Sequence, residues 1–496
     1  MDILTNLADG FAALFGGGGA PWWQPPLAAV AGVAVGIGVG VMPGLSASTG
    51  IALLVPFTYG MDPLTALVLL VSVYLATAYG GSVTAIAINT PGTPSSAAVG
   101  FDGYAMTQQG RPGYALGLAV ATNVAGGLLG ALVLIAFSAP LARAALSFGP
   151  PEYFALAVFG LTIVSSLEAG NALKGFLSTL LGLLVVTMGL DPVTGVMRYT
   201  FGLPVLNDGI SFIPALIGLF AMGEVLLNIE RMAGGAAAVA RVAGDRPSLR
   251  GAWAVKGHTA LGGLIGTLVG VVPGAGATIA AFLAYNEGRR FSRKPELFGK
   301  GSPEGLAAPS AAEGGSVGGA LVPLLTLGIP GSAATAVLVG ALMLHGVTPG
   351  PELFSGGNIK LVHGLFAALI LGNVLLLALG LLGTRLWVRI IEAPRAVLFP
   401  LILVVALVGS FGVANSLFDV WVCVVFGVVG WVLRRYGFPT APLVLALILG
   451  EMAEVNLRRA LIMGDVDIFF TRPVSLVLLV LAALSFAWPM VRARRR

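Results

Sequence analysis

The sequence predicts an all-α polytopic membrane protein, with about 11 transmembrane helices and two re-entrant hairpins arranged as an inverted-topology repeat. Three observations lead to this prediction. Hydrophobic residues make up 57% of the 496 residues and charged residues only 10%, whereas a soluble protein carries roughly 25% charge. Apolar runs such as 361–383 and 473–490 match the thickness of a bilayer core. One pattern of glycine and proline also occurs twice along the chain.

The composition excludes several classes of protein. The 71 glycines and 30 prolines favour closely packed and broken membrane helices over a simple anchor. The single cysteine, Cys423, excludes disulfides, and His258, His345 and His363 lack the spacing of a metal site. No phosphate-binding loop or hydrolase motif occurs, so we expect no enzyme activity and no catalytic residues. The net charge of +5 lies in short basic loops, so nucleic acid is not an expected partner.

An internal repeat organises the chain. Two sets of residues carry it, the second displaced by 230 positions from the first: Gly32, Gly36, Gly40, Pro43 and Gly44, then Gly262, Gly266, Gly270, Pro273 and Gly274. A second pair of motifs, 90–93 and 329–332, is displaced by 239 positions. We therefore expect a first membrane repeat at 1–230, a basic cytoplasmic linker at 231–257, and a second, inverted repeat at 258–496.

The distribution of Lys and Arg predicts the orientation, because basic loops stay in the cytoplasm. Basic residues flank the second Pro-Gly motif on both sides: Arg241, Arg246, Arg250 and Lys256, then Arg289, Arg290, Arg293, Lys294 and Lys300. The segment 258–285 is therefore predicted to be a hairpin that enters from the cytoplasm. No basic residue flanks the segment 27–58, which is predicted to be a hairpin entering from the opposite face. The N-terminus lacks the basic region of a cleavable signal peptide, since the first basic residue is Arg111.

Each hairpin is followed by a predicted broken helix, at 63–96 and at 304–345, and then by further helices to 229 and to 490. These assignments leave the C-terminus in the cytoplasm. The first break is the polar run at 89–96. Pro91 and Pro94 cannot continue a helix, and the freed backbone N–H groups attract anions. The hydroxyl, amide and glycine positions of this run are candidate substrate ligands: Asn89, Thr90, Gly92, Thr93 and Ser95. A purely structural kink is the alternative.

The second break contains the equivalent candidates Gly328, Gly331 and Ser332, with Pro330 as the helix breaker. We expect the two breaks to meet near the bilayer midplane. The hairpin tips combine breakers with hydroxyl residues, and we expect them to contact substrate or a bound Na+. The candidates are Ser46 and Ser48 beside Pro43-Gly44, and Thr278 beside Pro273-Gly274. No other metal site is expected.

Few ionisable residues lie near these motifs. Glu304 and Glu313 precede the second break, and a carboxylate inside a membrane is a functional candidate by default. Asp102 is expected to cap or anchor a loop, and Glu224 to reach the membrane interface. No Lys or Arg lies at either break. An anionic substrate would therefore be held by helix ends, backbone N–H groups and co-bound cations.

Several of these runs resemble the TctA family, the large membrane subunit of tripartite tricarboxylate transporters. The runs that carry the resemblance are 40–63, 79–82, 88–96, 101–104 and 323–332, and it covers essentially the whole chain. It implies secondary, cation-coupled uptake of carboxylates across the bacterial inner membrane by alternating access. It also implies two protein partners, a small four-helix membrane subunit of the TctB type and a periplasmic binding protein of the TctC type. The only cofactor expected is a coupling cation, Na+ or H+.

Two departures from the family pattern leave the substrate and the coupling ion open. Ala105 stands where we expect proline, and the run 310–314, with Glu313, replaces an Asn-Asn pair preceded by glutamate. A passive organic-anion channel is the main alternative function. A membrane enzyme or an assembly scaffold is disfavoured, since no catalytic constellation is present.

Overall fold

The computed structural model of the protein describes residues 3–17, 20–167, 172–232, 249, 251–384, 386–387 and 395–494. Most of the predicted basic linker at 231–257, including Arg241, Arg246 and Arg250, lies outside the described residues. The described chain is almost entirely helical. Its only sheet pairs two short antiparallel strands, β1 (Gly189–Leu190) and β2 (Met197–Arg198).

The helices of the first half form the following series: α1 (Ile3–Ala12), η1 (Ala13–Gly17), α2 (Gln24–Val41), α3 (Ala47–Leu54), η2 (Val55–Thr58), α4 (Pro63–Ile88), α5 (Ser96–Gln108), α6 (Pro112–Ala145), α7 (Pro150–Leu167), α8 (Ala172–Val186), η3 (Pro204–Leu206), α9 (Phe212–Leu216), η4 (Ile217–Met222) and α10 (Gly223–Met232).

The second half continues with η5 (Trp253–Val255), α11 (Lys256–Val271), α12 (Gly276–Phe291), η6 (Pro295–Leu297), α13 (Pro303–Leu327), α14 (Ala333–Leu344), η7 (Pro351–Phe354), η8 (Gly356–Asn358), α15 (Ile359–Leu382), α17 (Arg395–Ala414), α18 (Leu417–Arg435), α19 (Ala441–Met463), α20 (Ile468–Thr471) and α21 (Pro473–Arg494).

In the described part of the chain, eight helices are long and apolar enough to cross a membrane. They are 24–41, 63–88, 112–145, 212–230, 253–271, 359–382, 397–414 and 417–435. Shorter apolar helices include α8 and α14. The chain is therefore an all-α, multi-pass membrane protein, as predicted. The number of about 11 crossings and the re-entrant course of the hairpins stay predictions.

Both predicted helix breaks occur where proline and glycine place them. Helix α4 ends at Ile88 and α5 begins at Ser96, while α13 ends at Leu327 and α14 begins at Ala333. The two helices are capped by residues in the left-handed conformation, Asn89 at φ 53° and Gly328 at φ 72°. Asparagine and glycine are the residues that adopt this conformation most readily. The residues that cap α4 and α13 are separated by the 239-residue offset of the repeat.

The glycine ladders are close-packing faces, as their spacing suggests. Helix α2 packs along α4, and α11 packs along α13. A Cβ atom on a ladder glycine would lie under 3.0 Å from a backbone oxygen of the partner helix. The pairs on α2 and α4 are Gly32 with Leu69, Gly36 with Val73, and Gly40 with Thr77. Those on α11 and α13 are Gly262 with Ala308, Gly266 with Ala312, and Gly270 with Ser316. The partner residues in the two sets are again 239 positions apart.

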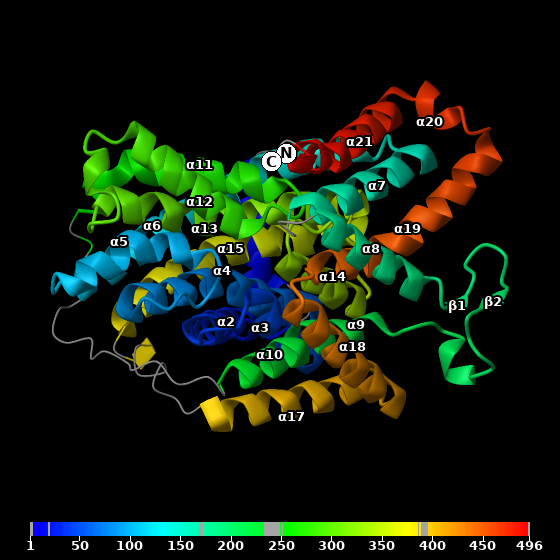
Figure 1. Ribbon diagram of the computed structural model, residues 1–496, viewed down its shortest axis with the longest axis horizontal. Helices are drawn as coiled ribbons and strands as arrows, with labels where there is room; N and C mark the ends of the chain where they lie inside the picture. The colour runs from blue at the N-terminus through cyan, green and yellow to red at the C-terminus, as the bar shows by residue number, and fades with distance from the viewer. Residues whose placement is uncertain are drawn as a thin grey trace.

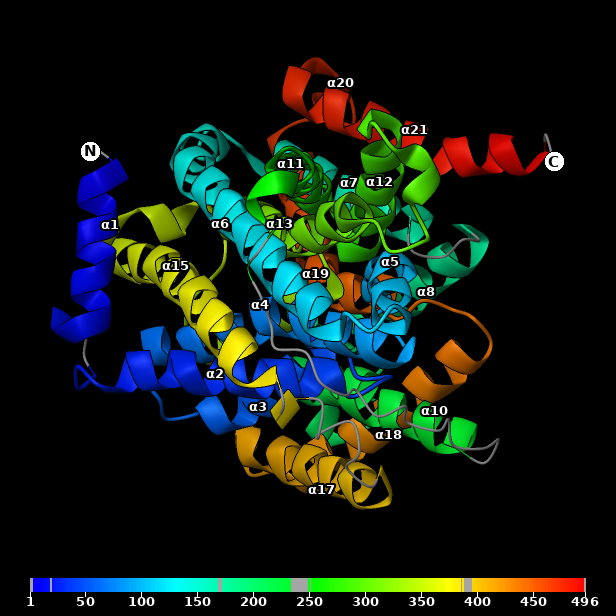
Figure 2. The same ribbon diagram turned by 90° about the vertical axis from the view of Figure 1, so that its left-hand side faces the viewer.

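The remaining helices surround this paired core in separate groups (Figures 1 and 2). Helices α7, α8, α19 and α21 pack on one another, and α18 packs on α17, η4 and α10. Helix α1, which was not among the predicted helices, packs beside α15 (Figure 2). The β1–β2 hairpin projects at the right-hand edge of Figure 1, away from the core.

Candidate functional site

The two repeats are joined through α4 and α13. The Tyr74 hydroxyl on α4 lies 3.0 Å from the Ser332 hydroxyl in the second break. The Ser82 hydroxyl, two turns further along α4, donates to Glu313 Oε2 on α13 at 2.8 Å. Contacts along α4 therefore run toward the start of α13, so the two helices are antiparallel. Tyr74 and Glu313 are themselves 239 positions apart and occupy equivalent places in the two repeats.

Each break packs against the hairpin of its own repeat. A Cβ on Gly92 would lie 2.7 Å from Gly81 Cα and against the Gly40 carbonyl oxygen. A Cβ on Gly331 would lie 2.8 Å from Ala320 Cα and 2.9 Å from the Gly270 carbonyl oxygen. These contacts are equivalent under the repeat, and neither position has room for a side chain.

The first break is a compact turn with a buried hydroxyl cluster. The Thr93 backbone N–H donates to Ser96 Oγ at 3.3 Å, and Ser96 Oγ donates to the Thr93 carbonyl at 2.8 Å. The hydroxyls of Thr93 and Ser95 lie 3.2 Å apart, and both side chains are buried. Thr90 is half-buried, whereas Asn89, Pro91 and Pro94 are exposed. Of the predicted ligands in this run, Gly92, Thr93 and Ser95 therefore face inward.

The second break starts α14 with a reciprocal cap. Ser332 accepts from the Thr335 N–H at 3.3 Å, and the Ser332 N–H donates to the Thr335 hydroxyl at 2.8 Å. Pro330 and Gly331 are buried, and Ile329 packs in the apolar cluster of α7 and α19. Among the described residues no hydrogen bond joins the two breaks directly, so their meeting at the midplane stays a prediction. The link between them runs through α4 and α13.

The tip of the first hairpin is held by polar side chains from α10. Hydroxyls of Ser46 and Thr49 donate to Glu224 Oε2, the first at 2.9 Å, and Ser48 lies 2.9 Å from the Ser46 hydroxyl. Glu224 also pairs with Arg434 at 3.4 Å. Asn228 Nδ2 donates to the Gly44 carbonyl, next to Pro43, at 2.8 Å. Glu224 thus belongs to this hairpin tip, a role that the sequence alone did not indicate.

The tip of the second hairpin lies in apolar surroundings. Pro273 and Gly274 are buried, and a Cβ on Gly274 would lie 2.7 Å from Val164 Cα on α7. The Gly274 N–H donates to the Gly331 carbonyl at 3.0 Å, which ties this tip to the second break. Thr278, in the first turn of α12, is half-buried.

Two of the carboxylates noted in the sequence have structural roles near the start of α13. Asp102, on α5, accepts the N–H groups of Gly299, Gly301 and Ser302 at 2.7–2.9 Å. It anchors this segment, as expected. Glu304 accepts from the Ser292 hydroxyl and lies 3.6 Å from His258 Nε2. Glu304 is therefore not part of either break.

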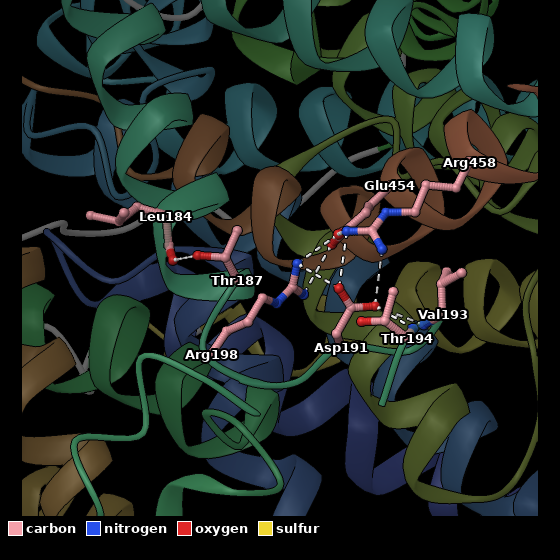
Figure 3. Close-up of polar contacts among 8 residues, drawn as sticks. All are labelled: Leu184, Thr187, Asp191, Val193, Thr194, Arg198, Glu454 and Arg458. Carbon is pink, nitrogen blue, oxygen red and sulfur yellow. Dashed lines mark hydrogen bonds and ion pairs between the residues drawn. The ribbon is translucent and has the colours of Figure 1, made fainter. Parts of the chain in front are cut away.

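A second polar cluster ties the β1–β2 hairpin to α19 (Figure 3). Asp191 pairs with Arg198 at 3.4 Å and with Arg458 at 3.0 Å. Glu454 pairs with the same two arginines, at 2.7 and 2.6 Å. Hydrogen bonds from the backbone of Thr194 and Val193, aided by Arg458, hold the pKa of Asp191 well below its usual range. The hydrogen bonds that Arg198 donates to Glu454 raise the pKa of Arg198.

This polar cluster borders a cavity of about 330 Å³ between α8, α9 and α19, lined in part by Arg198, Asn207, Asp208, Glu451 and Glu454. No sequence signal indicated this cavity, because its charged residues come from two segments more than 240 positions apart. The negative charges of the carboxylates are balanced by the arginines. The cluster therefore holds the β1–β2 hairpin against α19.

Comparisons with known proteins identify the family of the chain. The family model described as "Tripartite tricarboxylate transporter TctA family" matches residues 27–445. A protein of Agrobacterium vitis described as "Uncharacterized 52.8 kDa protein in TAR-I ttuC' 3'region" is 38% identical over 500 residues, covering 100% of this chain and 98% of its own. A second protein of the same organism, "Uncharacterized protein in TAR-II ttuC' 3'region", is 39% identical over 239 residues, covering 46% of this chain and 97% of its own.

No solved structure gives a significant match. The family match includes both hairpins and both breaks, and it covers most of the chain. It therefore assigns the chain to a family of transporter components, which agrees with the resemblance in the sequence motifs. The chain belongs to the tripartite tricarboxylate transporter TctA family.

Proposed function

We propose that this chain is the large permease subunit of a tripartite transporter in the bacterial inner membrane, and that it takes up carboxylates with a co-transported cation, Na+ or H+, by alternating access. One observation carries the proposal. Two repeat-related helix breaks are joined through the antiparallel helices α4 and α13, by Tyr74 with Ser332 and by Ser82 with Glu313. Broken helices related by an inverted repeat form the central substrate sites of many secondary transporters.

The chemistry of the breaks suits a carboxylate. Helices α5 and α14 begin at the two breaks, and their N-terminal ends attract negative charge. Thr93, Ser95 and Ser332 add hydroxyl groups. No Lys or Arg occurs in either break, so the anion would be held by dipoles and hydrogen bonds that can release it again. Specificity would then come largely from the periplasmic binding protein, with the small four-helix subunit as the second partner.

A passive organic-anion channel would need a continuous water path, which buried residues such as Gly92 and Gly331 do not favour. The two functions are separated by reconstituting the three components in vesicles without ATP. We expect carboxylate to accumulate above its external concentration when an inward cation gradient is imposed, and accumulation to stop when an ionophore dissipates the gradient. Simple equilibration at any gradient would favour the channel, and uptake that occurs only after ATP is added would contradict both.

The inverted arrangement makes a prediction about topology. If the first hairpin enters from the periplasm and the second from the cytoplasm, single cysteines in place of Gln24 and Tyr59 should react only with a periplasmic reagent. A cysteine in place of Lys294 should react only from the cytoplasm, since basic flanks are retained there. Labelling is measured with a membrane-impermeant maleimide on whole cells and on inverted vesicles. Reaction of positions 59 and 294 from the same face would rule out the inverted repeat.

A further inference from the structure

Five carboxylates are buried in the part of the chain whose side chains are described: Asp102, Glu152, Asp191, Glu313 and Asp419. Three of them are paired with backbone N–H groups or with arginines. Asp102 accepts three backbone N–H groups, Glu152 pairs with Arg472, and Asp191 pairs with two arginines. Asp419 has one oxygen, Oδ2, without a hydrogen-bond partner in the described residues, but it lies in the first turn of α18, where the helix dipole favours an anion. Among the described residues, Glu313 has no such paired group, and it does not lie in the first turn of its own helix.

Glu313 lies in the middle of α13 and is completely buried. One carboxylate oxygen, Oε2, accepts a hydrogen bond from Ser82. The other, Oε1, is buried with no hydrogen-bond partner in the described residues. Ser95, in the first break, interacts with the same carboxylate. Hydroxyl groups from α4 and from the first break are thus the polar groups that face Glu313.

The titratable side chains on the elements packed against α13 do not supply a counter-charge. In the described residues they are Tyr74 and Tyr79 on α4, Asp102 and Tyr104 on α5, Tyr114 and Arg143 on α6, Lys256 and His258 on α11, Tyr285, Glu287, Arg289 and Arg290 on α12, and Glu352 in η7. None of these forms an ion pair or a hydrogen bond with Glu313 in the described part of the chain. His258 lies beside Glu304 at the start of α13, roughly 13 Å along the helix from Glu313 at 1.5 Å per residue.

An ionised carboxylate in such surroundings is costly, because neither a cation nor a set of N–H donors replaces its hydration. A protonated carboxyl is neutral, and its second oxygen carries the proton. The closed packing around this residue supports the neutral form. A Cβ on Gly314 would lie 2.9 Å from the Gly127 nitrogen on α6, and one on Gly315 would lie 2.5 Å from the Gly263 carbonyl oxygen on α11. The Glu313 side chain itself is fully shielded from bulk solvent.

Glu224, the other carboxylate near a predicted site, differs in this respect. It pairs with Arg434 and accepts from Ser46 and Thr49, so its charge is already balanced. Tyr74, which occupies the place of Glu313 in the first repeat, carries a hydroxyl group that does not ionise near neutral pH. Only one of the two equivalent positions therefore holds an acid.

We propose that Glu313 binds the co-transported proton. This inference rests on the proposed function. It identifies the residue and the ion that couple carboxylate uptake to the cation gradient. In the neutral state, Glu313 bonds to Ser82 and lets the first break pack against α13. When the carboxylic acid gives its proton to water on the cytoplasmic side, the carboxylate that remains must be hydrated. Water then enters between α13 and the first break and separates them. Uptake of a proton from the periplasmic side restores the packing.

Transport in vesicles containing all three components tests the coupling. The substrate is radiolabelled citrate, succinate or malate, whichever the cognate binding protein retains. Glu313→Gln mimics the protonated side chain, so we expect it to keep exchange of labelled for unlabelled substrate and to lose accumulation driven by a proton gradient by at least tenfold. Glu304→Gln makes the same change on the same helix outside the breaks and should keep both activities. Proton-driven accumulation by Glu313→Gln at the wild-type level would overturn the proposal.

A spectroscopic measurement needs neither transport nor substrate. At neutral pH the infrared spectrum of the purified wild-type chain should contain the carbonyl band of a buried protonated carboxyl. The band should be missing from Glu313→Gln and present in Glu304→Gln. Its absence from the wild type would overturn the proposal even if Glu313→Gln fails to fold. If a sodium gradient drives accumulation and a proton gradient has no effect on it, the proposed role of Glu313 is wrong while the proposed function stands. A wild type that accumulates no carboxylate would instead contradict the proposed function.

Discussion

Replacing Gly36 with alanine should destabilise the protein strongly, whereas replacing Gly38 should not. A Cβ at position 36 would lie 2.6 Å from the Val73 carbonyl oxygen and 2.8 Å from Ala76 Cβ, both on α4. At position 38, on the same helix, no heavy atom lies within 4 Å of the new Cβ. Overpacking of this kind costs about 3 kcal/mol, which exceeds the gain of about 1 kcal/mol that alanine offers over glycine in a helix.

The measurement is the thermal unfolding midpoint of the purified chain in detergent, together with the yield of inserted protein. We expect Gly36→Ala to lower the midpoint by several degrees and Gly38→Ala to leave it unchanged or raise it. The second repeat offers the same comparison, with Gly266 against Gly257, where the space is also open. Equal stability of the Gly36→Ala and Gly38→Ala variants would mean that α2 and α4 do not pack as closely as the glycine ladder requires.

Three variants of Asn89 should separate its backbone role from a role in binding. Asn89 caps α4 in the left-handed conformation, and its side chain is exposed. Asn89→Ala loses the amide and also strains the backbone, by about 1–2 kcal/mol. Asn89→Gly loses only the amide and keeps the conformation, as Gly328 does at the end of α13. Asn89→Asp adds a negative charge that would repel a carboxylate.

If the amide binds substrate, Asn89→Gly should weaken apparent affinity by about tenfold to a hundredfold, since a hydrogen bond to a charged group contributes about 1.5–3 kcal/mol. Asn89→Asp should weaken it further. Thr93→Ala, which removes an inward-facing hydroxyl, should have an effect similar to that of Asn89→Gly. Uptake is measured against external substrate concentration in vesicles with equal amounts of inserted protein. Unchanged affinity in Asn89→Gly together with a stability loss in Asn89→Ala would show that Asn89 is a helix cap only.

The parts of the fold that could be predicted from the sequence are those in which a single residue type, such as proline or glycine, strongly restricts the local structure. Pro91 and Pro94 cannot continue a helix, so the first break was predictable, and the glycine spacing on α2 predicted a packing face. The all-helical membrane class followed from composition. Helix α13 is less apolar than a lipid-facing span, and its polar composition becomes intelligible only because α6, α11 and α12 enclose it.

What the sequence could not predict depends on contacts between distant segments. Glu224 lies 178 positions from Ser46, and nothing near it in the chain marks it as part of a hairpin tip. Glu313 could be singled out as an intramembrane acid, but its partner Ser82 lies 231 positions away. Asn89 illustrates the opposite difficulty. Its place in a polar run suggested a substrate ligand. In the structure, its left-handed conformation at the end of α4 is enough to explain why asparagine occurs there.

The two hairpin tips are held unequally, and this difference bears on the resting state of the transport cycle. The first tip is tied by hydrogen bonds to Glu224 and Asn228, and Glu224 is itself paired with Arg434. The second rests on Val164 and on a backbone bond within its own repeat. Releasing the first tip breaks hydrogen bonds to the carboxylate of Glu224 and to Asn228, whereas releasing the second breaks one backbone hydrogen bond and apolar contacts. We therefore expect an idle transporter to keep the first tip shut and to open more readily at the second. Cysteines in place of Ser48 and Thr278 should then react with a thiol reagent at very different rates when no substrate is present. Equal rates would mean that neither tip opens preferentially in the absence of substrate.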